Sequence, residues 1–214
     1  MGIKSALERI RSYDFEKNSG YEGVGNMNDE AWKVRTLAVR DLLRAGSSAG
    51  EPLREALGDD NRHVRHVAAM VLGLLQAENA VAELEKTARE DPDPIVRCQA
   101  AEALGQIRNP NAAEVLQNVA EADSNRNVKH RAVLALGALD DPDPGYEEVV
   151  EKFVSMDEKN FELVQVGEKA PDFSLKDTRG NVFKLYDSLA GKEYFVLIWI
   201  FADWCGVCQV EFHD

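Results

Sequence analysis

A repeat of about 32 residues constrains this chain more than any other feature. It runs from residue 29 to about residue 144, and each copy contains a valine followed by a basic residue and a helical apolar pattern. The repeat valines are Val34, Val64, Val96 and Val128, which fall 30, 32 and 32 residues apart. A repeat of this length predicts stacked helix pairs, because one pair alone cannot bury its apolar face.

Within each repeat, a second helical segment follows the first, as at residues 80–88 and 112–120. A glycine after the leucine of the first segment predicts the end of that helix in three repeats. Alanines at the predicted crossings, Ala38, Ala68, Ala100 and Ala132, would let the helices approach closely. Acids before each valine and bases after it predict ion pairs between adjoining units. These residues are Asp29, Asp59, Asp91 and Asp123, and Arg35, Arg65, Arg97 and Lys129.

These segments resemble the HEAT repeat family, in the short variety first associated with phycobilisome lyases. The resemblance implies a right-handed α-solenoid of about four helix pairs at residues 29–154, which would dock a protein partner. Residues 1–28 are expected to hold an additional helix, at 3–11, and a loose segment. The apolar pattern at 146–154 predicts the last helix of the array, with acidic outer positions suited to a cap. A bilin lyase is a further reading that rests on the repeat variety alone.

The second strong feature is a cysteine pair near the end of the chain. The apolar run at 194–201 has the length and the β-branched and aromatic content of a buried strand. Trp204, Cys205 and Cys208 follow it, where a strand would give way to a helix. Amide groups of the first helical turn would favour the Cys205 thiolate. Cys205 is therefore the predicted nucleophile, Cys208 the resolving thiol, and Trp204 the shield of the pair.

Upstream of this strand, residues 166–175, a polar turn at 176–180 and the alternating residues 181–185 predict a β-hairpin. Together with residues 167–173, 180–181 and 201–208, this order resembles the redoxin family of thioredoxin-like and alkyl-hydroperoxide-reductase-like proteins. The resemblance implies an incomplete α/β thioredoxin-like segment at 167–214, made of a hairpin, a core strand and the start of the active-site helix. Residues 155–166 would link it to the array. Because the sequence stops six residues after Cys208, we expect a longer protein or a second chain to complete the sheet, and little turnover from these 214 residues alone.

Three functions remain open for the redoxin segment. The Trp-Cys-x-x-Cys order resembles dithiol reductases and favours thiol–disulfide exchange. A peroxiredoxin-type peroxidase would be expected to carry a threonine where this chain has Ala202. In the third interpretation the protein is an interaction scaffold with an inert redoxin segment. A zinc site at the cysteine pair is disfavoured, because the nearby further ligand candidate is His213.

Composition limits the partners and the compartment. A net charge of −13 and a pI near 4.8 disfavour nucleic acid and anionic membranes as partners. The absence of a signal-like or membrane-spanning run, together with only three cysteines, predicts a cytoplasmic location. No cofactor and no metal are predicted, since His63, His66 and His130 do not form the helical His-Glu pairs of metal-binding HEAT hydroxylases. Cys98, Trp32 and Met70 are interpreted as core residues.

Overall fold

The computed structural model describes residues 2–16, 29–140, 146–156, 174–176 and 180–191. The chain divides into two compact units, Met1–Glu162 and Leu163–Asp214, and each is described by itself. Within the described ranges, no helix is both long enough and apolar enough to cross a bilayer.

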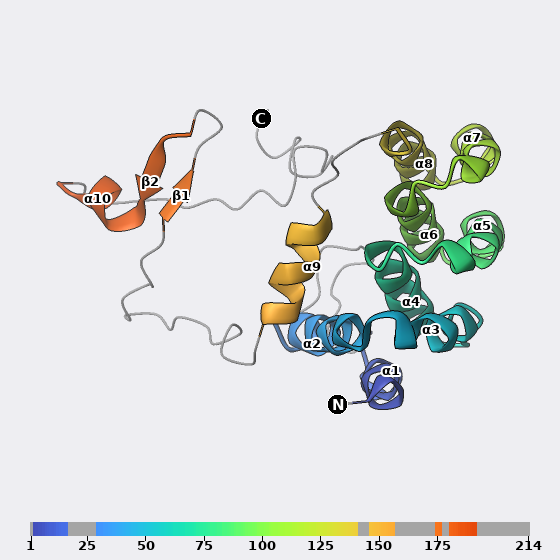
Figure 1. The fold of residues 1–214 in the computed structure, drawn as a ribbon, viewed down its shortest axis with the longest axis horizontal. Helices are drawn as coiled ribbons and strands as arrows, with labels where there is room; N and C mark the ends of the chain where they lie inside the picture. The colour runs from blue at the N-terminus through green and yellow to red at the C-terminus, as the bar shows by residue number, and fades with distance from the viewer. Residues whose placement is uncertain (1, 17–28, 141–145, 157–173, 177–179, 192–214) are drawn as a thin grey trace. The chain divides into compact units, whose positions relative to one another are not determined.

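The first unit is an array of antiparallel helices in two layers (Figure 1). Neighbouring helices pack as the pairs α1/α2, α3/α4, α5/α6 and α7/α8, and α2, α4, α6 and α8 stack side by side. The bounds are α1 Ile3–Ser12, α2 Asp29–Ala45, α3 Gly50–Ala56, α4 Arg62–Leu74, α5 Val81–Glu90, α6 Pro94–Ile107, α7 Ala113–Ala122 and α8 Arg126–Ala138. The predicted solenoid of about four helix pairs is confirmed. The additional helix expected at residues 3–11 is present as α1, which packs as the partner of α2.

Helices α4, α6 and α8 each begin at a side chain that caps the helix. Asn61, Asp93 and Asn125 accept hydrogen bonds from the backbone N–H groups of His63, Ile95 and Asn127 at 2.8, 2.8 and 2.9 Å. Such caps satisfy amides that have no partner within the helix. Their 32-residue spacing repeats that of the valines, and this is the signal by which these capping residues could be found in the sequence.

The repeat glycines do not end their helices as predicted. Gly73 and Gly105 lie inside α4 and α6, which continue to Leu74 and Ile107. The left-handed conformations after these helices belong to Gln76 and Arg108, with φ of 50° and 57°. The glycines instead serve packing: a Cβ on Gly105 would lie 2.8 Å from the Cα of Ala135 in the next helix.

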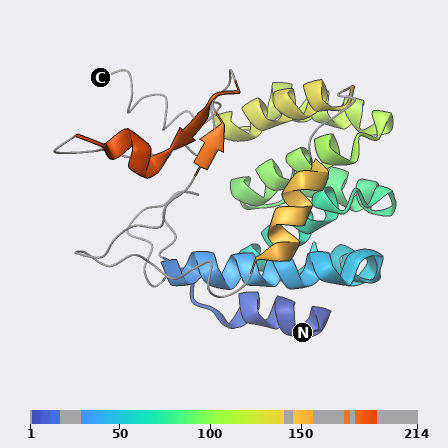
Figure 2. The same ribbon diagram turned by 60° about the vertical axis from the view of Figure 1, so that its left-hand side comes forward.

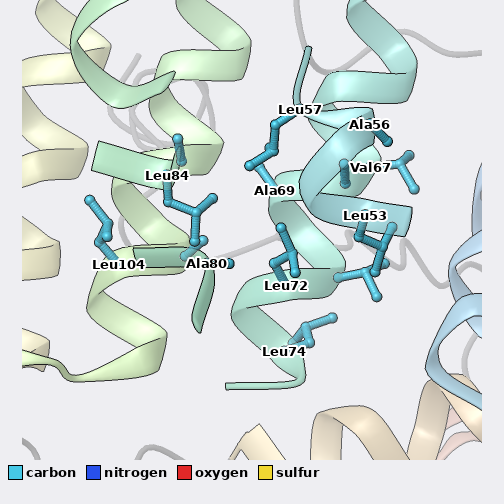
Figure 3. Close-up of a cluster of buried hydrophobic side chains, with 14 of the residues drawn as sticks. Leu53, Ala56, Leu57, Val67, Ala69, Leu72, Leu74, Ala80, Leu84 and Leu104 are labelled. Atoms are coloured by element: carbon cyan, nitrogen blue, oxygen red, sulfur yellow. The ribbon is translucent and has the colours of Figure 1, made fainter. Parts of the chain in front are cut away.

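The core lies between the two layers of the array. The crossing alanines Ala38, Ala68, Ala100 and Ala132 are all fully buried, as predicted. Leucines fill the spaces between layers, among them Leu53, Leu72, Leu84 and Leu104, which Figure 3 shows with their neighbours. Trp32 was expected in the core, but its side chain is 39% exposed. Met70 is partly buried and packs against the core. Between α2 and α3, a 3-10 turn, Gly46–Ala49, leads directly into α3.

Helix α9, Tyr146–Ser155, is present as predicted, but its principal contacts are with α2 (Figures 1 and 2). Arg44 donates from Nε to the carbonyl of Val154 at 3.0 Å, and Arg40 donates from Nη1 to the carbonyl of Met156 at 3.1 Å. Two cations thus meet the C-terminal carbonyls of α9, where the helix dipole favours positive charge. The chain therefore returns from α8 to the first repeat helix.

In the second unit, the predicted hairpin is present. Strand β1, Ser174–Lys176, pairs antiparallel with β2, Val182–Lys184, and Leu175 lies opposite Phe183. The short helix α10, Leu185–Leu189, follows β2 and begins at Leu185, the last residue of the predicted hairpin. Leu185 is its buried residue. The predicted core strand at 194–201 lies outside the described residues.

Candidate functional site

The predicted thiol site lies in the C-terminal part of the chain. Trp204, Cys205 and Cys208, and the zinc-ligand candidate His213, fall outside the described residues. Upstream of them the structure describes β1, β2 and α10, the elements that lead to the predicted strand. The order of hairpin and short helix is thus established as far as Gly191.

The third cysteine, Cys98, lies on α6 and is half buried against the core. It is a free thiol. Burial raises its pKa to about 11, and the nearby charge of Arg131 opposes this shift without overcoming it. Because the thiolate is the reactive form, Cys98 is a poor nucleophile at neutral pH. It behaves as the small core residue that the sequence predicted.

Ion pairs connect successive units along the array. Arg65 donates to both carboxylate oxygens of Asp91 at 2.7 and 2.9 Å, and Arg97 binds Asp123 in the same way at 2.8 and 3.0 Å. All four side chains are largely buried. These two rungs confirm the predicted pairing of acids and bases, in the two-pronged geometry that suits arginine.

The same aspartates also shape the loops before the helices. Asp91 accepts a hydrogen bond from the backbone N–H of Asp93 at 2.9 Å, and Asp123 accepts one from Asn125 at 2.7 Å. Burial alone would raise the pKa of Asp123, but the hydrogen bonds from Arg97 and Asn125 outweigh it and lower that pKa. Each aspartate therefore joins a helix cap to the preceding unit.

The predicted ion pair between Arg35 and Asp59, the first in this series, is not formed. Asp59 is bound by Arg11 of α1 at 2.6 Å and not by Arg35. Arg35 lies 5.5 Å from the ring centroid of Phe15, and its Nη2 is 3.4 Å from Nδ1 of His63. Burial and the charge of Arg62 lower the pKa of Arg35 to about 10, so it remains a cation at neutral pH. The N-terminal helix has thus displaced a repeat arginine, which stacks on an aromatic ring instead.

His63 and His66, which the sequence did not predict to bind a metal, lie beside this cluster. His63 stacks on Phe15 with ring centroids 4.3 Å apart, and its Nε2 is 3.2 Å from Glu16. His66 is buried, and desolvation together with the charge of Arg35 lowers its pKa to about 3. In the part of the chain that the structure describes, no three His, Cys, Asp or Glu side chains are grouped to hold a metal.

Comparisons with known proteins agree with the two parts of the chain. Residues 25–97 and 81–164 match HEAT repeats, and residues 166–214 match the AhpC/TSA family. No curated protein matches. Among solved structures, human deoxyhypusine hydroxylase in complex with glycerol is 28% identical, with a TM-score of 0.45. The match covers 64% of this chain and 43% of the hydroxylase, so the chain spans less than half of that relative. Because the HEAT match extends over more than half of the chain, the chain belongs to the HEAT repeat family, and the segment that follows the array matches the AhpC/TSA family.

Proposed function

We propose that the protein is a thiol–disulfide oxidoreductase, or part of one, whose HEAT array binds a protein partner. The observation that carries the proposal is the redoxin match at residues 166–214, which contains Trp204, Cys205 and Cys208 in the dithiol order. The described hairpin before them agrees with that family's element order.

In the proposed reaction, the Cys205 thiolate attacks one sulfur of a substrate disulfide and forms a mixed disulfide, while the other substrate sulfur leaves as a thiolate. Cys208 then loses its proton and attacks Cys205, which releases the second substrate sulfur. Two electrons pass to the substrate, which takes up two protons as its thiols form. The chain is left with a disulfide between Cys205 and Cys208. Cys98 is excluded from this exchange by its raised pKa.

The array supplies the protein-binding half of the proposal. HEAT repeats generally mediate protein–protein contacts, and the stacked pairs present side chains on a long continuous surface. A dithiol that acts on protein disulfides gains effective concentration when the same chain holds its substrate. The cytoplasmic location inferred from cysteine usage belongs to this proposal, because a reducing compartment keeps the pair ready to donate electrons.

The test is stoichiometric, so that it does not require repeated turnover. The full chain is equilibrated in glutathione buffers of graded ratio, its free thiols are alkylated, and its mass is measured. We expect Cys205 and Cys208 to lose their thiols together in the wild type and in Cys98→Ser, and the linked species to be absent from Cys205→Ser. If the pair never links, the scaffold interpretation replaces the enzyme.

A peroxidase is the second candidate, because the matching family is AhpC/TSA. Reduced protein mixed with one equivalent of hydrogen peroxide or of oxidised insulin separates the two. Oxidation by insulin with release of insulin thiols supports the reductase. Oxidation by peroxide alone supports the peroxidase, despite Ala202 at the position where a hydroxyl would be expected.

A further inference from the structure

The last repeat helix carries an open stripe of residues that in the other repeats binds the next helix. Lys129, Val133 and Gly137 of α8 are spaced four apart and so lie on one side of the helix. The equivalent stripes, 32 residues apart, are Arg65, Ala69 and Gly73 on α4, and Arg97, Ala101 and Gly105 on α6. We call the residues Lys129, Val133 and Gly137 the end face.

In α4 and α6 this stripe is covered by the following helix. Ala69 and Ala101 are fully buried. A Cβ on Gly73 would lie 2.8 Å from the Cα of Ala103, and one on Gly105 would lie 2.8 Å from the Cα of Ala135. Backbones approach this closely only where a glycine faces a small residue. The stripe is therefore the surface of α4 and α6 on which the first helix of the next repeat packs.

On α8 the same stripe is open. Val133 is 55% exposed, and a Cβ on Gly137 would meet nothing within 4 Å among the described residues. The next described helix, α9, has its principal contacts with α2 (Figure 1). The ammonium of Lys129 donates to the backbone carbonyl of Glu121 at 2.6 Å, whereas Arg65 and Arg97 bind carboxylates of the next unit.

We infer that the end face binds a helical hairpin of an acidic partner protein, which extends the stack by one pair. The hairpin presents a small residue to Gly137 and a carboxylate, in the turn between its helices, to Lys129. This geometry continues the interfaces already present between α4, α5 and α6, where Ala103 meets Gly73 and Asp91 meets Arg65. The inference rests on the protein-binding half of the proposed function and not on its thiol chemistry.

Charge selects an acidic partner over a second copy of this chain. Helix α8 contains Arg126, Lys129, His130 and Arg131 and no Asp or Glu. Arg131 pairs with Glu102 of α6 and so faces the preceding repeat. Two end faces placed together would bring the two Lys129 side chains into apposition, which is unfavourable. A head-to-tail contact would place the end face against α1, whose outer residues Lys4, Ser5 and Glu8 are polar and exposed. A foreign hairpin with carboxylates avoids both conflicts.

The probe for the test is a fluorescent peptide of residues 81–107, which carries Asp91 and Ala103, with Ser in place of Cys98. Its two helices are joined by an engineered disulfide, and circular dichroism confirms that it is helical. We expect saturable binding to the full-length chain, weakened about tenfold or more by Val133→Glu or by Gly137→Trp. Val149→Glu, at an exposed valine of α9, is the matched control and should leave binding unchanged.

A charge exchange makes the test specific for the carboxylate. An Asp91→Lys probe should bind the wild type weakly and should recover on the Lys129→Glu chain. Absence of binding by the helical probe, or binding that Val133→Glu leaves unchanged, overturns the inference. So does a sedimenting dimer that Val133→Glu dissociates, or protection of Val133 from carbene labelling in the isolated chain. Linkage of Cys205 to Cys208, measured on the same variants, reports separately on the proposed chemistry.

Discussion

At the scale of single residues, the repeat glycines show how position decides the effect of one methyl group. Gly105→Ala should lower the free energy of unfolding by about 1–3 kcal/mol, because its Cβ would lie 2.8 Å from Ala135 Cα and force the helices apart. Gly137→Ala should raise that free energy by about 0.5–1 kcal/mol, since the site is open and alanine favours helix. Urea unfolding checks both, with the midpoints shifting in opposite directions at constant slope. Equal shifts would contradict the difference between the two sites.

From the sequence alone, a glycine that ends a helix could not be distinguished from one that allows a neighbouring helix to approach. A glycine near a helical boundary predicts a terminus from local conformation, but Gly73 and Gly105 are required by a neighbour about 30 residues away. Arg35 presents the same problem. Its place in the repeat predicts an ion pair with Asp59 of the next unit, but Asp59 is bound by Arg11 of α1. Both outcomes depend on residues far apart in the chain.

At the scale of elements, α9 is held on α2 by few polar contacts, which makes its attachment testable. Arg44→Met removes both donors to the Val154 carbonyl and keeps the aliphatic length of the side chain. The loss of about 1 kcal/mol should speed amide exchange in α9 roughly fivefold. Exchange in α4 to α7 should not change. Hydrogen exchange with mass spectrometry measures both, and Arg89→Met, at an exposed arginine of α5, is the control.

The helices themselves were predictable because each has an apolar side and a polar side at helical spacing. Their pairing was less so. An apolar helix face can pair with the helix before it or with the helix after it, and the pairing of α1 with α2 shifts the register of the pairs by one helix. The position of α9 could not be predicted either. An amphipathic pattern predicts that a helix packs on the protein, but it does not indicate which element the helix packs against.

At the scale of the whole molecule, the array should lose stability in acid through His66, to which His63 adds because burial lowers its pKa as well. The pKa of His66 is lowered to about 3 in the folded chain, while an unfolded histidine titrates near about 6.5. Between these values the unfolded state binds the additional proton, so the stabilisation is complete above about pH 6.5 and declines as pH falls. The slope for one proton is about 1.4 kcal/mol per pH unit. Urea titrations from pH 7 to 4 should show this slope in the wild type and a flatter one in His66→Leu.

The control for this experiment is Asn118→Leu, at an exposed asparagine of α7, which removes no titratable group and should retain the wild-type slope. An unchanged slope in His66→Leu would show that His66 is not the titrating group. Below about pH 4 a further loss should follow, because the hydrogen bonds that Asp59, Asp93 and Asp123 accept lower their pKa values against the effect of burial. A depressed carboxylate pKa stabilises the fold above the unfolded value and ceases to do so as pH falls through the folded value.

By itself, the sequence determined that this protein is a stack of helix pairs followed by a redoxin segment with a dithiol motif. Those conclusions depend on periodicity and on local motifs, which are properties of nearby residues. Tertiary structure decided that α1 completes the first pair, that α9 returns to α2, and that the glycines of α4 and α6 admit the next helix. It also left Lys129, Val133 and Gly137 open on α8. These features arise from contacts between distant parts of the chain, where burial and charge pairing select one neighbour among several that the sequence pattern allows.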